Sequence, residues 1–132
     1  MIALDTNVLA RLVLRDSPAE YQIAAELIAN HACSVSWTVL VELSWVLERS
    51  ARLSRDEIAA AIGTIGDIDC IAVPDDRRLA WAVDRYRQGA DFADMIHLVS
   101  TLGGSASFAS FDRKLQRQAG AHSPLPVTTL RG

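Results

Sequence analysis

The chain has 132 residues and a formal net charge of −3, and half of its residues are hydrophobic. This length and composition predict one soluble globular domain with a core of its own, and they exclude a disordered protein. No apolar run approaches the ~18 residues that cross a bilayer, and the N-terminus, MIALDTNVL, lacks the layout of a secretory signal. We therefore expect a cytoplasmic protein with no membrane association.

Short strands and helices alternate along the first half of the chain. We expect strands over residues 1–4 and 33–36, and helices over residues 18–30, 39–50 and 55–65. Pro18 behind Ser17 is typical of a helix start, and Ser54 with Glu57 fits a capping box. Thr38 is the expected N-cap of the helix between them.

The second half continues the alternation. We expect strands over residues 70–73, 107–109 and 126–128, and helices over residues 75–88, 91–102 and 112–118. One apolar helix face is predicted to consist of Leu79, Ala82, Val83 and Tyr86. Strands that alternate with helices indicate βαβ crossovers and a mostly parallel sheet covered on both faces. Because no repeat or linker interrupts the chain, residues 1–132 are expected to form a single domain.

The two cysteines, Cys33 and Cys70, form no CxxC motif. Without a signal for export, such a pair is more typical of two buried thiols than of a disulfide. The basic residues are twelve Arg and one Lys. Arg suits bidentate phosphate contacts, although genomic base composition produces the same bias.

Four carboxylates, Asp5, Glu42, Asp94 and Asp112, each lie where a strand ends or a helix begins. In a parallel α/β fold such places converge on one edge of the sheet. A pocket of unpaired carboxylates repels itself unless a positive charge fills it. Hard divalent cations prefer oxygen ligands, and phosphate chemistry is what they most often serve. The pattern therefore predicts an acidic metal site.

Each of these acids also has an ordinary structural interpretation. Asp5 fits a turn, Glu42 flanks an apolar helix stripe, and Asp112 is a possible N-cap. That stripe is predicted to consist of Val39, Leu43, Val46 and Leu47. Asp91 and Asp94 both favour the positive end of a helix, and capping is the first interpretation for Asp91.

Two further groups of side chains suggest contacts with partners. Arg113, Lys114 and Arg117 follow the last of the four acids, where they fit either an RNA backbone or a solvated helix face. Val41 and Trp45 lie one helical turn apart and away from the apolar stripe. A helix that is apolar on two sides often has a second partner, so these two residues are a candidate interface.

Four segments in this order, LDTNVL, VELSWVL, DFADMIHL and SFDRKL, resemble PIN domains, and specifically the VapC-type toxin ribonucleases. The resemblance covers nearly the whole chain. It implies a three-layer α/β/α sandwich with a central, mostly parallel sheet of four to five strands. The family's acidic quartet maps onto Asp5, Glu42, Asp94 and Asp112, and none of the four acids is missing.

The same resemblance implies supporting residues and partners. Asp91 matches an additional acidic position, and Thr6, Asn7 and Ser110 match polar positions that support the metal-binding carboxylates. It also implies Mg²⁺, or Mn²⁺ in its place, as the cofactor. The implied partners are an RNA substrate, a second copy in a homodimer, and a cognate VapB-type antitoxin, with higher-order toxin–antitoxin assemblies also found.

The expected function is therefore metal-dependent cleavage of phosphodiester bonds in tRNA, rRNA or mRNA by the toxin of such a pair. An alternative is a regulatory module that acts mainly through antitoxin and operator DNA and catalyses little. A third interpretation is phosphoryl transfer by another α/β fold, such as a receiver or a phosphatase. The sequence argues against the third, because no DxDxT/V motif follows the first strand.

Overall fold

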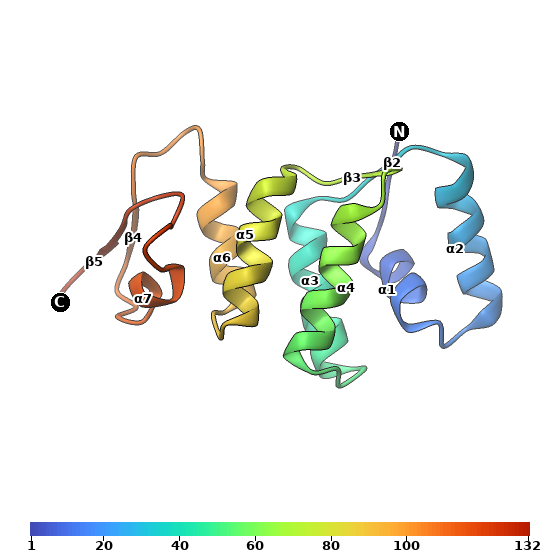
Figure 1. Ribbon diagram of the computed structural model, residues 1–132, viewed down its shortest axis with the longest axis horizontal. Helices are drawn as coiled ribbons and strands as arrows, with labels where there is room; N and C mark the ends of the chain where they lie inside the picture. The colour runs from blue at the N-terminus through green and yellow to red at the C-terminus, as the bar shows by residue number, and fades with distance from the viewer. The chain divides into compact units, whose positions relative to one another are not determined.

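The computed structural model describes all residues, 1–132, as two compact units: unit 1, residues 1–76, and unit 2, residues 77–132. Unit 1 contains β1 (Ile2–Ala3), α1 (Thr6–Leu14), α2 (Pro18–Asn30), β2 (Cys33–Ser34), α3 (Trp37–Arg49), α4 (Arg55–Asp67) and β3 (Ile71–Ala72). Helix α5 (Asp76–Arg87) begins at the boundary, and unit 2 continues with α6 (Phe92–Ser100), β4 (Phe108–Ser110), α7 (Leu115–Ala119) and β5 (Val127–Thr129). Figure 1 shows these elements. No helix has the length and apolar character needed to cross a membrane.

The sheet of unit 1 is parallel throughout, in the order β1-β2-β3. Cys33 lies at its centre, beside Ile2 on one strand and Ile71 on the other. Parallel neighbours need crossover connections, and the pairs α1–α2 and α3–α4 supply them. The predicted parallel α/β class is therefore confirmed, but this sheet has three strands instead of the expected four to five, β4 and β5 form a second sheet, and the strands are shorter than expected.

Helix α1 was missed by the sequence-based interpretation, which placed no element between Asp5 and Pro18. The helix starts at Thr6, behind Asp5 as its N-cap, and ends at Arg15, whose backbone is left-handed with φ 52°. Glycine is the usual residue at such a helix end. Because an arginine takes its place here, the sequence carries no stop signal for a helix over these residues.

The helices of unit 1 pack in series. Helix α1 contacts both α2 and α3, and α3 contacts α4 (Figure 1). The fully buried leucines and isoleucines of this unit are Leu9, Leu40, Leu43, Leu47, Ile58 and Ile62. The predicted stripe of α3 was partly wrong, because Leu40 is buried while Val39 and Val46 are only half-buried. The N-cap of α3 is Ser36 rather than Thr38, and its side chain accepts from the backbone of Val39.

The second sheet, in unit 2, pairs β4 with β5 in parallel, with Phe108 beside Val127 and Ser110 beside Thr129. Helix α7 packs against β5. The predicted apolar face of α5 is confirmed, since all four of its members are buried. Tyr86 meets Phe92 edge to face, with ring centroids 5.7 Å apart. This contact joins the end of α5 to the start of α6.

Both cysteines are free thiols, as the sequence predicts. Cys33 is buried and Cys70 is half-buried, although the backbone N–H of Cys33 donates to the carbonyl of Cys70 at 2.8 Å. Burial, followed by the charge of Cys70, raises the pKa of the Cys33 thiol. Cys33 is therefore a core residue of the sheet.

Candidate functional site

Unit 1 carries two of the predicted acids, and Thr6 links them. Oδ1 of Asp5 accepts the backbone N–H of Thr6 at 2.8 Å, which starts helix α1. The hydroxyl of Thr6 donates to Oε1 of Glu42 on α3. Thr6 is buried, whereas both carboxylates are exposed. The packing of α1 on α3 thus brings Asp5 and Glu42 to one buried residue, Asp5 at the backbone N–H of Thr6 and Glu42 at its hydroxyl.

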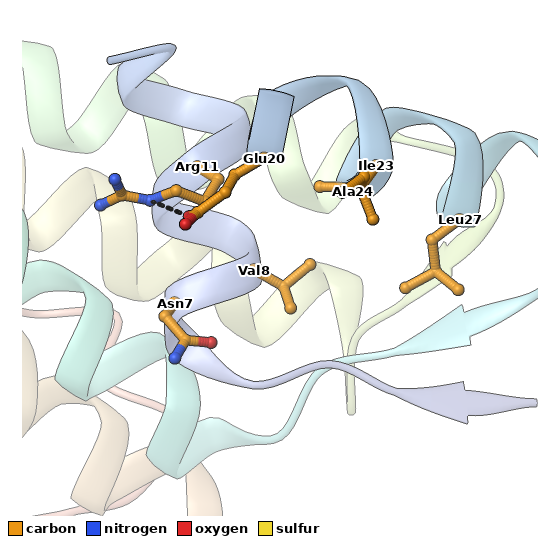
Figure 2. Close-up of a pocket in the computed structure, with 7 residues that line it drawn as sticks. All are labelled: Asn7, Val8, Arg11, Glu20, Ile23, Ala24 and Leu27. Atoms are coloured by element: carbon orange, nitrogen blue, oxygen red, sulfur yellow. Dashed lines mark ion pairs between the residues drawn. The ribbon is translucent and has the colours of Figure 1, made fainter. Parts of the chain in front are cut away.

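Asn7, the next predicted residue, is exposed on α1 and lines a pocket of about 340 Å³. Figure 2 shows this pocket between α1 and α2. Its apolar lining consists of Val8, Ile23, Ala24 and Leu27. At its edge Arg11 forms an ion pair with Glu20, at 3.8 Å. Neither Asp5 nor Glu42 lines this pocket, so the candidate acids of unit 1 belong to the open surface.

Unit 2 carries the other acids, and two of them act on the third, Asp94. Asp91 is the N-cap of α6, and its Oδ1 accepts the backbone N–H of Asp94 at 2.9 Å. Burial raises the pKa of Asp94, the charges of Asp91 and Asp112 raise it further, and His97 opposes them. The first turn of a helix normally favours a negative charge. At Asp94, burial and the charges of Asp91 and Asp112 outweigh that preference, so the negative charge of this carboxylate is poorly stabilised.

Asp112 fixes the turn that follows β4. Its backbone N–H donates to Oγ of Ser110 at 3.0 Å, and its Oδ1 accepts the N–H of Lys114 at 2.9 Å. The predicted N-cap role of Asp112 is wrong, because α7 begins at Leu115, behind Lys114. Ser110 therefore holds the backbone of Asp112.

The predicted RNA-contact residues lie on the surface of unit 2. Arg113, Lys114 and Arg117 are exposed, and none of them forms an ion pair. Their guanidinium and ammonium groups are therefore open to an external anion.

The predicted interface residues lie on α3 in unit 1. Trp45 is 43% exposed and Val41 is half-buried. The guanidinium of Arg49 lies over the Trp45 ring, 5.7 Å from its centroid. An exposed Trp with only one cationic neighbour leaves a large apolar surface in contact with water.

The chemistry of the acids suits a divalent cation. None of Asp5, Glu42, Asp94 and Asp112 pairs with Lys or Arg. Carboxylate oxygens are the ligands that Mg²⁺ and Mn²⁺ take in proteins. Neither unit by itself groups three or more His, Cys, Asp or Glu side chains so that they could hold a metal ion. Each unit contributes two of the four predicted ligands.

One exposed residue in this region was not singled out from the sequence. Phe111 lies between Ser110 and Asp112 and is 67% exposed. A phenylalanine at the end of a predicted strand is usually read as a core residue. Its polar flanks, in the segment SFDRK, are the signal that could have identified it.

Comparison with known proteins gives one match. A family model described as PIN domain matches residues 2–121, a range that includes every candidate acid. No curated protein and no solved structure matches the chain.

Proposed function

The chain belongs to the PIN domain family, whose members are generally nucleases, and on that premise we propose that it is a Mg²⁺- or Mn²⁺-dependent endoribonuclease. It cuts phosphodiester bonds of tRNA, rRNA or mRNA as the toxin of a VapBC-type pair. The family match runs through both units, which supports one PIN domain over residues 1–132. The parallel α/β architecture agrees with the α/β/α class of this family.

The observation that carries the proposal is a set of acids without cationic partners. Asp5 and Glu42 flank Thr6 in unit 1, and the ionised form of Asp94 is disfavoured by burial and by Asp91 and Asp112 in unit 2. Structural acids normally have a partner that stabilises their charge. A bound divalent cation would offset this excess of negative charge.

The proposed site contains metal ligands and residues that position these ligands. Asp5, Glu42, Asp94 and Asp112 are the proposed carboxylate ligands that would hold a divalent cation. The Thr6 hydroxyl keeps one oxygen of Glu42 in a fixed orientation, and the Asp91 side chain holds the backbone of Asp94. When bound, a divalent ion activates water and stabilises negative charge on phosphate and leaving oxygens. The protein thus contributes positioning and charge.

The proposed partners follow from the same surfaces. A VapB-type antitoxin neutralises the enzyme, and a basic side chain of that partner would find unpaired carboxylates at the acidic site. A second copy of the chain covers Val41 and Trp45 in a homodimer, and the antitoxin can extend the dimer into larger assemblies. The exposed Trp45 supports this choice, because tryptophan is among the residues most enriched at the centres of interfaces.

Cleavage of purified RNA by the wild-type chain and its variants tests the proposal. We expect Asp5→Asn and Asp94→Asn to lower the rate in Mg²⁺ by about 100-fold or more, since one charge interaction of several kcal/mol is lost. EDTA should abolish cleavage by the wild type. Asp84→Asn is the matched control, because Asp84 is an exposed acid of α5 that accepts only from Gln88. Full cleavage by Asp5→Asn would contradict the proposal.

The cellular substrate is found by sequencing RNA ends after induction of the wild type and of Asp5→Asn. Ends that accumulate only with the wild type mark its cleavage sites. If no RNA class gains ends over the Asp5→Asn strain, the chain is not a toxin ribonuclease in the cell.

A regulatory module that acts through antitoxin and operator DNA is the second candidate. It is favoured by the ordinary contacts of three acids: Asp5 and Asp91 cap helices, and Asp112 holds a turn. Rapid, EDTA-sensitive cleavage by the isolated chain excludes it as the main role. Operator binding by the antitoxin complex together with failure to cut any RNA would support it.

A further inference from the structure

We propose that Phe111 is a stacking platform for a base of single-stranded RNA, and that Arg113, Lys114 and Arg117 bind the adjoining phosphates. The inference rests on the proposed ribonuclease function and adds to it a substrate-binding surface. It is carried by the position of Phe111 in the fold, by the cations that follow it in the sequence, and by the distribution of charge between the two units.

Phe111 extends from a fixed piece of backbone. It follows β4 directly and is flanked by Ser110 and Asp112, whose hydrogen bonds define the next turn. Just beyond the neighbouring strand β5, the N–H of Leu130 donates to the carbonyl of Ser110 at 2.7 Å. The last pair of the parallel register is Ser110 with Thr129, and Phe111 and Leu130 are the residues that follow the two strands. A platform held at both sides loses little conformational entropy when a base binds.

The exposure of Phe111 distinguishes it from the other aromatic residues of unit 2. It is 67% exposed, whereas Tyr86 and Phe92 are buried and Trp81 and Phe108 are half-buried. Leaving a phenylalanine in water forgoes the stabilisation that full burial of such a side chain contributes. The fold provides a core for its other aromatic rings, so the open position of Phe111 points to a ligand.

Three cations without ion-pair partners follow this ring closely in the sequence. Arg113 and Lys114 follow within three residues, Arg117 is one helical turn further on, and all three are exposed and lack an ion pair. Such groups bind phosphates and release counterions. Aromatic rings interleaved with basic groups are how proteins bind single-stranded nucleic acid.

The net charge of unit 2 also favours RNA as the ligand of Phe111. Residues 77–132 contain eight Lys and Arg against four acids, a net charge of +4, whereas residues 1–76 contain five against twelve, a net charge of −7. The mildly acidic total of −3 conceals this asymmetry. A polyanion is therefore attracted to unit 2, and Phe111 is that unit's most exposed large hydrophobic residue.

Single-stranded RNA also fits the RNA cleavage proposed for the neighbouring residue Asp112. Phe111 and Asp112 are consecutive, so a base stacked on the ring would hold the RNA backbone next to one of the proposed metal ligands. A protein partner that packs against the apolar side chains of Phe111 and Leu130 would bind equally well if residue 111 were aliphatic. Stacking on a base requires an aromatic ring. Replacing the aromatic ring by an aliphatic side chain therefore distinguishes RNA from a protein partner.

The test measures binding of a fluorescent oligouridine of about 12 nucleotides by the full chain in EDTA, where no cleavage occurs. Phe111→Leu keeps an apolar side chain but removes the ring, and we expect it to weaken Kd about fivefold or more. Phe111→Tyr should bind within about twofold of the wild type, because it keeps the stacking face. Leu130→Ala is the matched control just beyond the neighbouring strand, with the same expectation of about twofold or less.

A second probe removes the base instead of the ring. Binding is measured for a series of oligonucleotides, each with one abasic site at a different position. At the stacked position, base removal should weaken wild-type binding about fivefold and leave the affinity of Phe111→Leu almost unchanged. Equal melting temperatures of the variants show that folding is intact, as expected for a side chain in water.

Three outcomes would overturn the inference. Wild-type affinity of Phe111→Leu excludes stacking. Losses of RNA affinity in Phe111→Tyr and Leu130→Ala as large as that in Phe111→Leu would show that apolar area, and not stacking on the ring, binds the oligonucleotide. Failure of the wild type to bind the oligonucleotide excludes the RNA surface altogether. Cleavage in Mg²⁺ is scored separately, so a wild type that binds RNA through Phe111 without cutting it would contradict the proposed nuclease and leave the RNA surface standing.

Discussion

Thr6 and Glu42 lie 36 residues apart in the sequence, and the hydroxyl of the first donates a hydrogen bond to Oε1 of the second. Thr6 is only 5% exposed. Its backbone N–H is bound to Asp5, so one residue contacts two of the proposed metal ligands. We infer that Thr6 is a positioning residue for this pair of carboxylates.

Replacing Thr6 by Val keeps the shape of the side chain and removes the donor. We expect kcat for RNA cleavage to fall about tenfold, because Glu42 loses its fixed orientation, with a smaller effect on KM. The free energy of unfolding should fall by about 1 kcal/mol, since the exposed carboxylate can turn to water. Steady-state kinetics and urea denaturation measure the two effects.

Thr6→Ser is the control, because it restores the hydroxyl. It should recover most of kcat, whatever it costs in packing. A Thr6→Val enzyme with the kcat of the wild type would show that the orientation of Glu42 does not matter for cleavage.

The raised pKa of Asp94 predicts a pH-dependent stability. A group whose pKa is higher in the folded chain contributes stability that is present below its unfolded pKa and is lost as the pH rises through its folded pKa. Without metal, ionised Asp94 therefore destabilises the fold near neutrality. Because Asp94 is only partly buried, solvent screens this effect, and we expect Asp94→Asn to raise Tm by only about 2 °C at about pH 7.

The same variant should have little effect near pH 3, where Asp94 is protonated in both states. Adding Mg²⁺ should reverse the order of the two proteins at neutral pH, because a bound cation stabilises the carboxylate and the amide binds it poorly. Thermal melts in EDTA and in Mg²⁺ at both pH values decide this. A lower Tm for Asp94→Asn in EDTA at neutral pH would show that the helix dipole outweighs the burial and repulsion described above.

The two thiols should react differently with a disulfide reagent such as dithionitrobenzoate. Cys33 is buried and its pKa is raised, so little thiolate is present, whereas Cys70 is partly exposed. The native chain is expected to release about one equivalent of thiolate quickly, and the second only in denaturant. A Cys70→Ser chain that still reacts fast when native would contradict the burial of Cys33.

Helix starts could be predicted from the sequence because they depend on residues within one turn. The capping box of Ser54 and Glu57 forms in both directions, at 3.2 and 2.9 Å, and Asp91 caps α6. The hydrogen bonds from Ser54 also lower the pKa of Glu57. These contacts need no tertiary information.

The buried face of α3 was less predictable because packing selects it. Leu40 and Val39 lie on adjacent ridges of one helix, and both are apolar. Contact with α1 and α4 buries the leucine ridge. The sequence-based interpretation lacked α1 entirely, so the partner that selects the ridge was missing from it.

The identities of the candidate acids came from four ordered motifs, whereas their contacts required the fold. The Thr6–Glu42 hydrogen bond depends on the packing of α1 against α3, and the influence of Asp112 on Asp94 depends on where β4 ends. Neither of these two interactions can be predicted from a short segment of the sequence. Phe111 went unnoticed for a similar reason, because exposure is a property of the folded unit.

The proposed homodimer predicts the behaviour of a charge placed on α3. Trp45→Glu should weaken self-association about 100-fold or more, because a central tryptophan is lost and a carboxylate would be buried in its place. Multi-angle light scattering across a dilution series measures the mass. Ile23→Glu is the matched control, since Ile23 is also apolar, is 67% exposed and lies in unit 1, but on α2. If Ile23→Glu yields the monomer while Trp45→Glu remains dimeric, the α2 surface is the interface instead.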